Sequence, residues 1–237
     1  EEWIFMRRSL LPSLLTLLEQ NQKTQEKNIS IFELSKIYLK KANDLPDEKL
    51  RLTVLQSGHK PFFCLKGIME LVFAKLNIAN YKLKTPTNNP LFYNPKSADI
   101  IIDNQLVGYL GEVKPVIANN FNLGKPATVL DIDFQLLCQL ASLSKKFEPL
   151  PVFPPIIEDL TLQFGKRIFY SRIIDLVKKT SNLISKIDLV DQYENKKTFR
   201  IYYQHPQKSL TNQEVGKIRK SIVKNLEKEG LVLVGQV

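Results

Sequence analysis

The C-terminal part of the chain is best interpreted from one stretch, Thr198-Phe199-Arg200-Ile201-Tyr202-Tyr203-Gln204. Apolar Phe199, Ile201 and Tyr203 alternate with more polar neighbours, a period of two that is typical of a strand with one buried face. Around it the expected order is strand, helix, strand, strand, helix, strand, at residues 159–164, 171–182, 184–193, 198–204, 212–229 and 231–234. This order predicts a ferredoxin-like βαββαβ sandwich.

The second helix of this module carries the clearest local signals. Thr211 and Glu214 have the spacing of a capping box, which marks a helix start. The apolar residues that follow form one stripe at helical spacing: Val215, Ile218, Ile222 and Leu226.

The other alternating set should line the sheet face that no helix covers. Its expected members are Thr161 and Gln163 on the first strand, and Thr198, Arg200, Tyr202 and Gln204 on the third. An aromatic ring beside a guanidinium suits unpaired RNA bases, which stack on such planes. An ordinary polar sheet face with a surface tyrosine explains the same residues, so the pattern leaves both interpretations open.

A proline-rich segment precedes this module. Pro149, Pro151, Pro154 and Pro155 fall close together, and prolines stiffen a connection and interrupt regular structure. We therefore predict two domains, residues 1–145 and 156–237, joined by a linker at 146–155.

The N-terminal domain is expected to be α+β. Helices are predicted at residues 4–19, 62–76 and 134–140, and strands at 29–39, 50–56, 98–102, 106–110 and 127–133. Residues 85–95, rich in Pro and Asn, are predicted to form a loop.

The chain of 237 residues carries a net charge of +10. Residues 150–237 hold 15 Lys and Arg against 9 Asp and Glu, so the basic excess is denser at the C-terminal end. A polyanionic partner is one explanation, because Lys and Arg neutralise phosphates. A protein that is simply basic is the other.

The sequence also leads to expectations about membrane spans, secretion signals and the cellular compartment. No apolar run approaches the roughly 20 residues that cross a bilayer, and Glu1 and Glu2 stand where a secretory signal would be basic. We interpret the chain as a piece of a longer protein. Cys64 and Cys138 have apolar neighbours and are predicted to be buried free thiols, which indicates a reducing, cytoplasmic compartment.

Catalytic constellations are scarce. His59 and His205 are predicted to be loop histidines, neither at metal-ligand spacing from a Cys or another His. Asp131 and Asp133 share a strand face and could bind Mg²⁺, although solvated edge carboxylates are the commoner explanation. With no nucleophile–base set, an independent enzyme is disfavoured.

Several short motifs follow one another along almost the whole chain. In order they are RSLLPSLL (8–15), IFELSK (31–36), LKGIME (65–70), NPKSA (94–98), GYLGEVKP (108–115), FPPIIEDL (153–160), DLVDQY (188–193) and LTNQEV (210–215). In this order they resemble motifs of the bacterial-type phenylalanine–tRNA ligase beta subunit family. The chain departs from the family pattern at Ser35, Asn94 and Glu158, where the family has Gly, His and Arg, and it lacks the family's Arg near the C-terminus.

The resemblance implies a fold and a division of labour. Residues 1–145 would form a class II synthetase-like module, an antiparallel sheet with helices that lacks catalytic residues and packs on the catalytic alpha subunit in an (αβ)₂ assembly. Residues 156–237 would form the anticodon-binding domain. ATP and Mg²⁺ would act in the assembled enzyme, with no cofactor in this segment.

With an anticodon-binding role for this domain, the residues predicted to bind tRNA(Phe) are Thr161, Gln163, Lys197, Arg200, Tyr202 and Gln204. The competing hypothesis is a protein-interaction scaffold that makes no direct RNA contact.

Overall fold

The computed structural model describes residues 5–24, 28–86, 89–142, 151–165 and 168–235. The chain divides into two compact units, Glu1–Lys146 and Phe147–Val237. Residues 146–150 of the predicted linker lie outside the described residues. Each unit is described by itself.

Unit 1 is built on a six-stranded antiparallel sheet in the order β1-β2-β6-β5-β4-β3. Its strands are β1 (Ile29–Leu39), β2 (Asp47–Ser57), β3 (Tyr81–Lys84), β4 (Phe92–Ile102), β5 (Gln105–Val113) and β6 (Ala127–Asp133). Its helices are α1 (Leu11–Gln22), α2 (Pro61–Lys75), α3 (Pro115–Asn120) and α4 (Phe134–Leu140).

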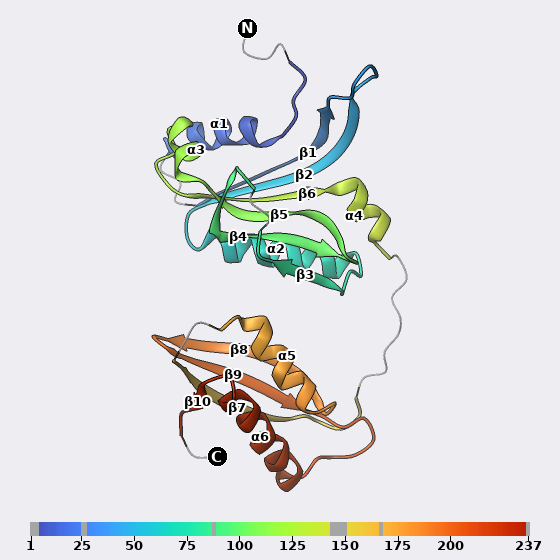
Figure 1. The fold of residues 1–237 in the computed structure, drawn as a ribbon, viewed down its shortest axis with the longest axis vertical. Helices are drawn as coiled ribbons and strands as arrows, with labels where there is room; N and C mark the ends of the chain where they lie inside the picture. The colour runs from blue at the N-terminus through green and yellow to red at the C-terminus, as the bar shows by residue number, and fades with distance from the viewer. Residues whose placement is uncertain (1–4, 25–27, 87–88, 143–150, 166–167, 236–237) are drawn as a thin grey trace. The chain divides into compact units, whose positions relative to one another are not determined.

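Helices cover both faces of this sheet (Figure 1). On one face α1 buries Leu14, Leu15 and Leu18 in a cluster that includes Leu55 and Val129. On the other, α2 buries a second apolar stripe against the neighbouring positions of the same strands. This second cluster includes Leu65, Met69, Phe73, Val54, Leu110 and Leu130. Consecutive strand residues therefore supply two cores, because side chains alternate across a sheet.

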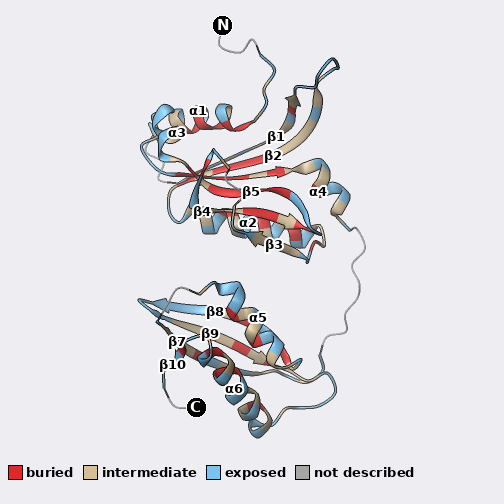
Figure 2. Ribbon diagram, viewed as in Figure 1, coloured by how far each residue is buried: buried red, intermediate tan, exposed pale blue. Residues whose placement is uncertain are grey.

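Unit 2 has the predicted order of elements, with four antiparallel strands arranged β10-β7-β9-β8. The elements are β7 (Ile156–Phe164), α5 (Tyr170–Thr180), β8 (Ile184–Tyr193), β9 (Lys196–Tyr203), α6 (Asn212–Glu227) and β10 (Leu231–Leu233). Both helices pack on one face, where Phe199, Ile201 and Tyr203 are buried with Ile173 and Ile222. The prediction of an α+β chain that ends in a ferredoxin-like sandwich is confirmed, and Figure 2 shows the buried residues of this unit.

The first helix was predicted too early in the chain. It begins at Leu11 with a proline in its first turn, a position where the missing N–H costs nothing. The preceding segment lies beside β1, where Tyr38 N donates to Arg7 O at 2.9 Å. The Arg7 side chain also bonds Glu33 at 2.6 Å and Ser35. These contacts with β1 place Arg7 beside the strand and outside the predicted helix.

Two short elements, β3 and α3, were missed, and β4 starts inside the predicted loop 85–95. β3 has four residues and pairs with β4 alone. α3 has six residues. Neither element is long enough to show a clear hydrophobic periodicity in the sequence, so each depends on strand pairing or packing in the folded chain.

The prediction that both cysteines are buried was wrong. Cys64 and Cys138 are free and exposed. Cys64 lies on the outer side of α2, a helix whose apolar residues continue beyond its buried stripe. Apolar neighbours in sequence therefore did not indicate a core position.

Candidate nucleic-acid interface

The candidate interface is the sheet face of unit 2 opposite α5 and α6, here called the open face. Opposed residues in an antiparallel pair share a face. The register pairs Asp159 with Arg200, Thr161 with Thr198, and Ile157 with Tyr202. Since the alternate residues Phe199, Ile201 and Tyr203 lie in the helix-covered core, Arg200 and Tyr202 lie on the open face, as predicted.

Arg200 is held by a two-point ion pair. Its Nε and Nη2 each lie 2.8 Å from a carboxylate oxygen of Asp159 on the neighbouring strand. The hydrogen bonds from Arg200 keep the pKa of the Asp159 carboxyl below its usual value. The guanidinium is therefore fixed in position by Asp159, and its charge is already compensated.

Tyr202 has a cation beside its ring. Lys186 of β8 places Nζ 5.1 Å from the ring centroid, and the same Nζ pairs with Asp188 at 2.6 Å. The ring and the ion pair are therefore neighbours on the open face. Asp188 is also the register partner of Arg200, so charges of both signs alternate across β7, β9 and β8.

The remaining predicted residues divide into three groups. Thr161 bonds the Thr198 hydroxyl at 2.9 Å, and Gln163 is exposed on the same face. Gln204 follows β9 and donates its amide to Phe153 O at 2.7 Å, so this side chain ties down the segment before β7. Lys197 is opposite Leu162, a core residue, and its Nζ lies 5.0 Å from the Phe164 ring. Lys197 therefore lies on the helix-covered side, apart from the other predicted residues.

Sequence reasoning missed two apolar members of the open face, Ile157 and Val232. Both are at least half exposed, and Val232 is the register partner of Gln163. Both residues occupy strand positions that alternate onto the open face, and this alternation could have identified them. The prediction was instead based on aromatic, basic and polar residues.

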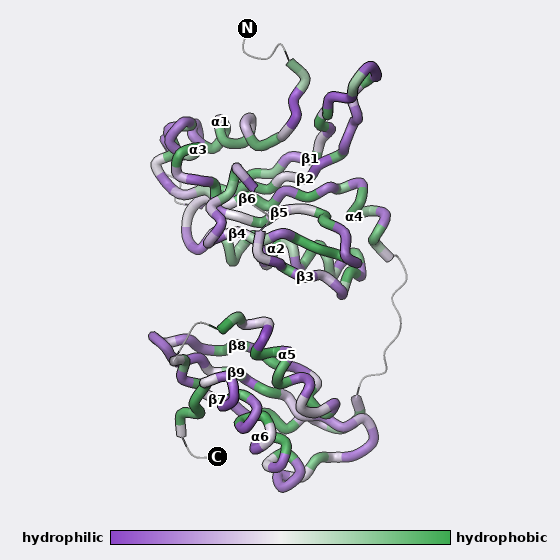
Figure 3. Tube along the Cα trace, in the orientation of Figure 1, coloured by the Kyte–Doolittle hydropathy of each residue, from purple (hydrophilic) through white to green (hydrophobic). Residues whose placement is uncertain are grey.

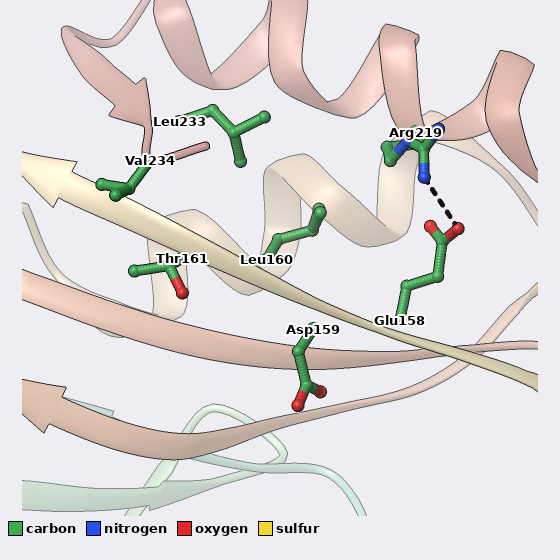
Figure 4. Close-up of a pocket in the computed structure, with 7 residues that line it drawn as sticks. All are labelled: Glu158, Asp159, Leu160, Thr161, Arg219, Leu233 and Val234. Carbon is green, nitrogen blue, oxygen red and sulfur yellow. Dashed lines mark hydrogen bonds and ion pairs between the residues drawn. The ribbon is translucent and has the colours of Figure 1, made fainter. Parts of the chain in front are cut away.

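The basic residues of α6 separate into two sets. Lys217, Lys220, Lys224 and Lys228 are exposed on the side of the helix opposite its buried stripe, and none makes an ion pair within the described residues. Arg219 instead turns toward β7, where its Nη1 bonds Glu158 Oε1 at 3.0 Å (Figure 4).

Glu158 and Arg219 help to line a cavity of about 290 Å³ between β7, α6 and the end of β10. Burial, followed by the nearby Glu158 charge, raises the pKa of Tyr203. Glu158, one of the departures from the family pattern, therefore serves an ion pair on the helix-covered side and is not part of the open face.

The other candidate residues of the sequence have structural partners. Asp131 accepts hydrogen bonds from Arg51 at 2.7 Å and Thr53 at 2.9 Å on the central strands, so it is not an edge residue. Asp133 caps α4 by accepting from Leu136 N. His205 accepts from Gln207 N in a turn. Among the described residues, no group of three or more His, Cys, Asp or Glu could hold a metal.

Comparison with known proteins decides the family. Residues 1–134 match the model of the phenylalanyl tRNA synthetase beta chain CLM domain, and residues 151–233 match the ferredoxin-fold anticodon binding domain. The chain belongs to the phenylalanyl-tRNA synthetase beta chain family. The resemblance predicted from the eight motifs is thereby confirmed.

Curated relatives carry the same family name. The chain is 29% identical to the phenylalanine–tRNA ligase beta subunit of Clostridium acetobutylicum over 96% of its length, and 28% identical to that of Carboxydothermus hydrogenoformans over 94%. It spans about 30% of the length of these relatives.

Structural likeness is weaker. Two solved structures of pyrrolysyl-tRNA synthetase from Desulfitobacterium hafniense share 18% sequence identity with the chain. One covers 60% of this chain and 54% of its own with a TM-score of 0.47, and the other covers 56% and 49% with 0.48. Within the described part of the chain, no helix combines the length and apolarity that a membrane crossing needs.

Proposed function

We propose that the chain is the C-terminal portion of a phenylalanine–tRNA ligase beta subunit, in which unit 2 binds tRNA(Phe) through its open face. The observation that carries the proposal is the placement of Tyr202 and Arg200 side by side on a helix-free sheet face of a domain matched to anticodon binding. Bases stack on aromatic rings and guanidinium planes, so this face suits unpaired anticodon-loop bases.

Unit 1 would then pack against the catalytic alpha subunit within an (αβ)₂ assembly. Large apolar side chains on its surface support this role. Phe32 on β1 is 71% exposed and has Leu34 on the same strand face, while Leu71 on the outer side of α2 is 60% exposed. Large exposed apolar side chains such as the Phe32 and Leu34 pair on β1 are typical of protein interfaces.

Chemistry would belong to the assembled enzyme. It would activate phenylalanine with ATP and Mg²⁺ in the cytoplasm and transfer it to tRNA. This segment would contribute binding and positioning, with no catalytic side chain or cofactor of its own.

The experiment that tests RNA binding is a tRNA(Phe) titration of the full chain across a salt series. We expect log affinity to fall linearly with log salt concentration. Tyr202→Ala should weaken binding by roughly 1–3 kcal/mol, the range measured for base stacking. Phe169→Ala is the matched control, because Phe169 is an exposed aromatic residue at the start of α5, on the helix-covered side. Equal affinity of the folded Tyr202 variant and the control would overturn the assignment of the open face.

The second candidate function is a protein scaffold with no direct RNA contact. The ion pairs on the open face favour this candidate, because Asp159 and Asp188 neutralise Arg200 and Lys186, which would otherwise be free to bind phosphates. Salt-independent or undetectable tRNA binding, together with retained alpha-subunit binding, would select this candidate.

Alpha-subunit binding can be tested separately by co-expression and co-purification. Phe32→Ser with Leu34→Ser should reduce recovery of the alpha subunit. Leu45→Ser, in the turn of the same hairpin and 81% exposed, should leave it unchanged. Equal recovery for both variants would remove β1 from the interface.

A further inference from the structure

A second cavity, of about 420 Å³, opens in unit 1 where α2 begins. Pro61, Phe62 and Phe63 of α2 and Pro95 of β4 line it, so much of its wall is apolar. It lies on the sheet face that α2 covers, beside the first turn of that helix. None of the roles proposed above for the open face uses it.

The floor of this cavity is a polar row that crosses three strands. Thr128 of β6 is opposite Gln56 of β2 and Glu112 of β5, and opposed residues share a face. Thr128 and Glu112 both line the cavity. These polar groups interrupt the apolar cluster of Val54, Leu110 and Leu130 on the same face.

Two atoms of this row have no hydrogen-bond partner within the described residues. Thr128 is 0% exposed, and its Oγ1 is unpartnered; Gln56 Oε1 is buried and unpartnered as well. A buried polar atom without a partner destabilises the fold, and native proteins contain few of them. Thr128 lines the cavity, so its unpartnered hydroxyl indicates a molecule that hydrogen-bonds to it there.

Charges of both signs line the same space. Lys60 and Lys96 lie at the rim, and the 15-residue helix α2 begins there without a side-chain cap. A helix N-terminus favours negative charge. Glu112 pairs with Lys96 at 2.9 Å and is the register partner of Thr128. The part of the cavity at Lys60 therefore suits an anion, and the part at Glu112 and Thr128 suits a cation that donates hydrogen bonds.

We infer that this cavity binds a free α-amino acid with a large apolar side chain. The carboxylate would meet Lys60 and the start of α2. The ammonium group would donate to Thr128 Oγ1 and the Glu112 carboxylate, which both line the cavity. The side chain would pack against Phe62, Phe63 and the prolines. The carboxylate, the ammonium group and the apolar side chain of such a ligand would each contact a part of the cavity wall with complementary chemistry.

The test uses the full chain and three probes in calorimetric or ligand-observed NMR titrations. L-phenylalanine carries all three parts, 3-phenylpropionate lacks the ammonium group, and 2-phenylethylamine lacks the carboxylate. We expect binding of L-phenylalanine in the millimolar range or tighter, and at least about tenfold weaker binding of each analogue. 3-Phenylpropionate leaves Thr128 Oγ1 without a partner, and 2-phenylethylamine brings no carboxylate to Lys60. No binding of L-phenylalanine, or equal binding of all three, would overturn the inference.

A pair of isosteric variants supplies an independent readout. Thr128→Val removes the unpartnered hydroxyl, so it should raise the melting temperature of ligand-free protein while weakening L-phenylalanine binding about tenfold. Thr53→Val is the matched control on the same sheet. Its hydroxyl is bonded to Asp131 at 2.9 Å, so this change should lower the melting temperature and leave binding unchanged. Unaltered binding by the folded Thr128 variant would place the ligand elsewhere and refute the site.

Discussion

Arg200 on β9 and Asp159 on β7 face each other in register and form a two-point ion pair with both contacts at 2.8 Å. Planar, bidentate pairing of this kind restricts the guanidinium to one orientation. Arg200, one of the residues predicted to bind RNA, is therefore presented by the fold together with its own counter-ion. This relationship leads to the first prediction.

Asp159→Asn should strengthen tRNA(Phe) binding severalfold at low salt, because it frees the Arg200 charge for phosphate without changing side-chain shape. Since hydrogen bonds from Arg200 lower the pKa of Asp159, wild-type Asp159 stays largely ionised even at a pH near the ordinary pKa of Asp, and the pair persists through mildly acidic pH. Asp175→Asn makes the same charge change on the exposed side of α5 and should have little effect. Equal gains from both variants would mean that only net charge matters.

The exposed lysines of α6 should contribute little to tRNA binding if the open face is the interface. Lys220→Gln with Lys224→Gln should leave the slope of log affinity against log salt nearly unchanged, because both side chains point away from the sheet. A lysine that contacts phosphate contributes about one unit to that slope. A slope reduced by about two units in the double variant would move the interface to α6.

Glu158→Arg, which introduces the residue expected here from the family resemblance, should destabilise unit 2. It places a second guanidinium beside Arg219, where Glu158 now bonds Nη1 at 3.0 Å and both side chains are largely shielded from solvent. We expect a loss of roughly 1–3 kcal/mol in the free energy of unfolding. Adding Arg219→Glu should recover much of that loss by rebuilding the pair with reversed charges. Chemical denaturation of the two single variants and the double variant measures the coupling, and additive losses would contradict it.

Gly108→Ala should disrupt the centre of the unit 1 sheet. A Cβ at this position would lie 2.2 Å from Asp131 O and 2.9 Å from Ile132 Cα on the adjacent strand. Backbone atoms of a central strand cannot shift locally, so we expect a cost of about 1–3 kcal/mol or more in thermal unfolding. Gly67→Ala, in the interior of α2 with no atom within 4 Å of the new Cβ, should instead stabilise by about 0.5–1 kcal/mol. A stable Gly108 variant would contradict the pairing of β5 with β6.

Acid should weaken unit 2 through the start of α6. Hydrogen bonds from Lys208 and then from Thr211 lower the pKa of Glu214 to about 2. A lowered folded-state pKa contributes stability above the unfolded value, and this stability is lost as pH falls toward the folded value. Glu214→Gln keeps a capping-box side chain without a charge. Its melting temperature should therefore depend less on pH than that of the wild type between the unfolded pKa and about 2. Parallel curves for the two proteins would show that Glu214 does not couple protonation to folding.

Local pattern determined much of the architecture from the sequence alone. The alternation in β9, the Thr211–Glu214 capping box and the order of elements predicted the ferredoxin-like unit, because strand and helix periods depend on neighbouring residues. The boundaries of β1 and α4 matched the structure for the same reason. The order of the short motifs indicated the family.

Tertiary structure alone decided which side chains are available. Asp159 meets Arg200 across 41 residues of sequence, Glu158 meets Arg219 across 61, and Arg51 meets Asp131 across 80. Such pairs depend on strand register and helix packing, which no local period encodes. The same holds for Thr128, whose burial beside an open cavity follows from the alignment of β2, β6 and β5 and from where α2 begins. Sequence patterns thus predict elements, while long-range contacts determine the charge and chemistry that each surface presents.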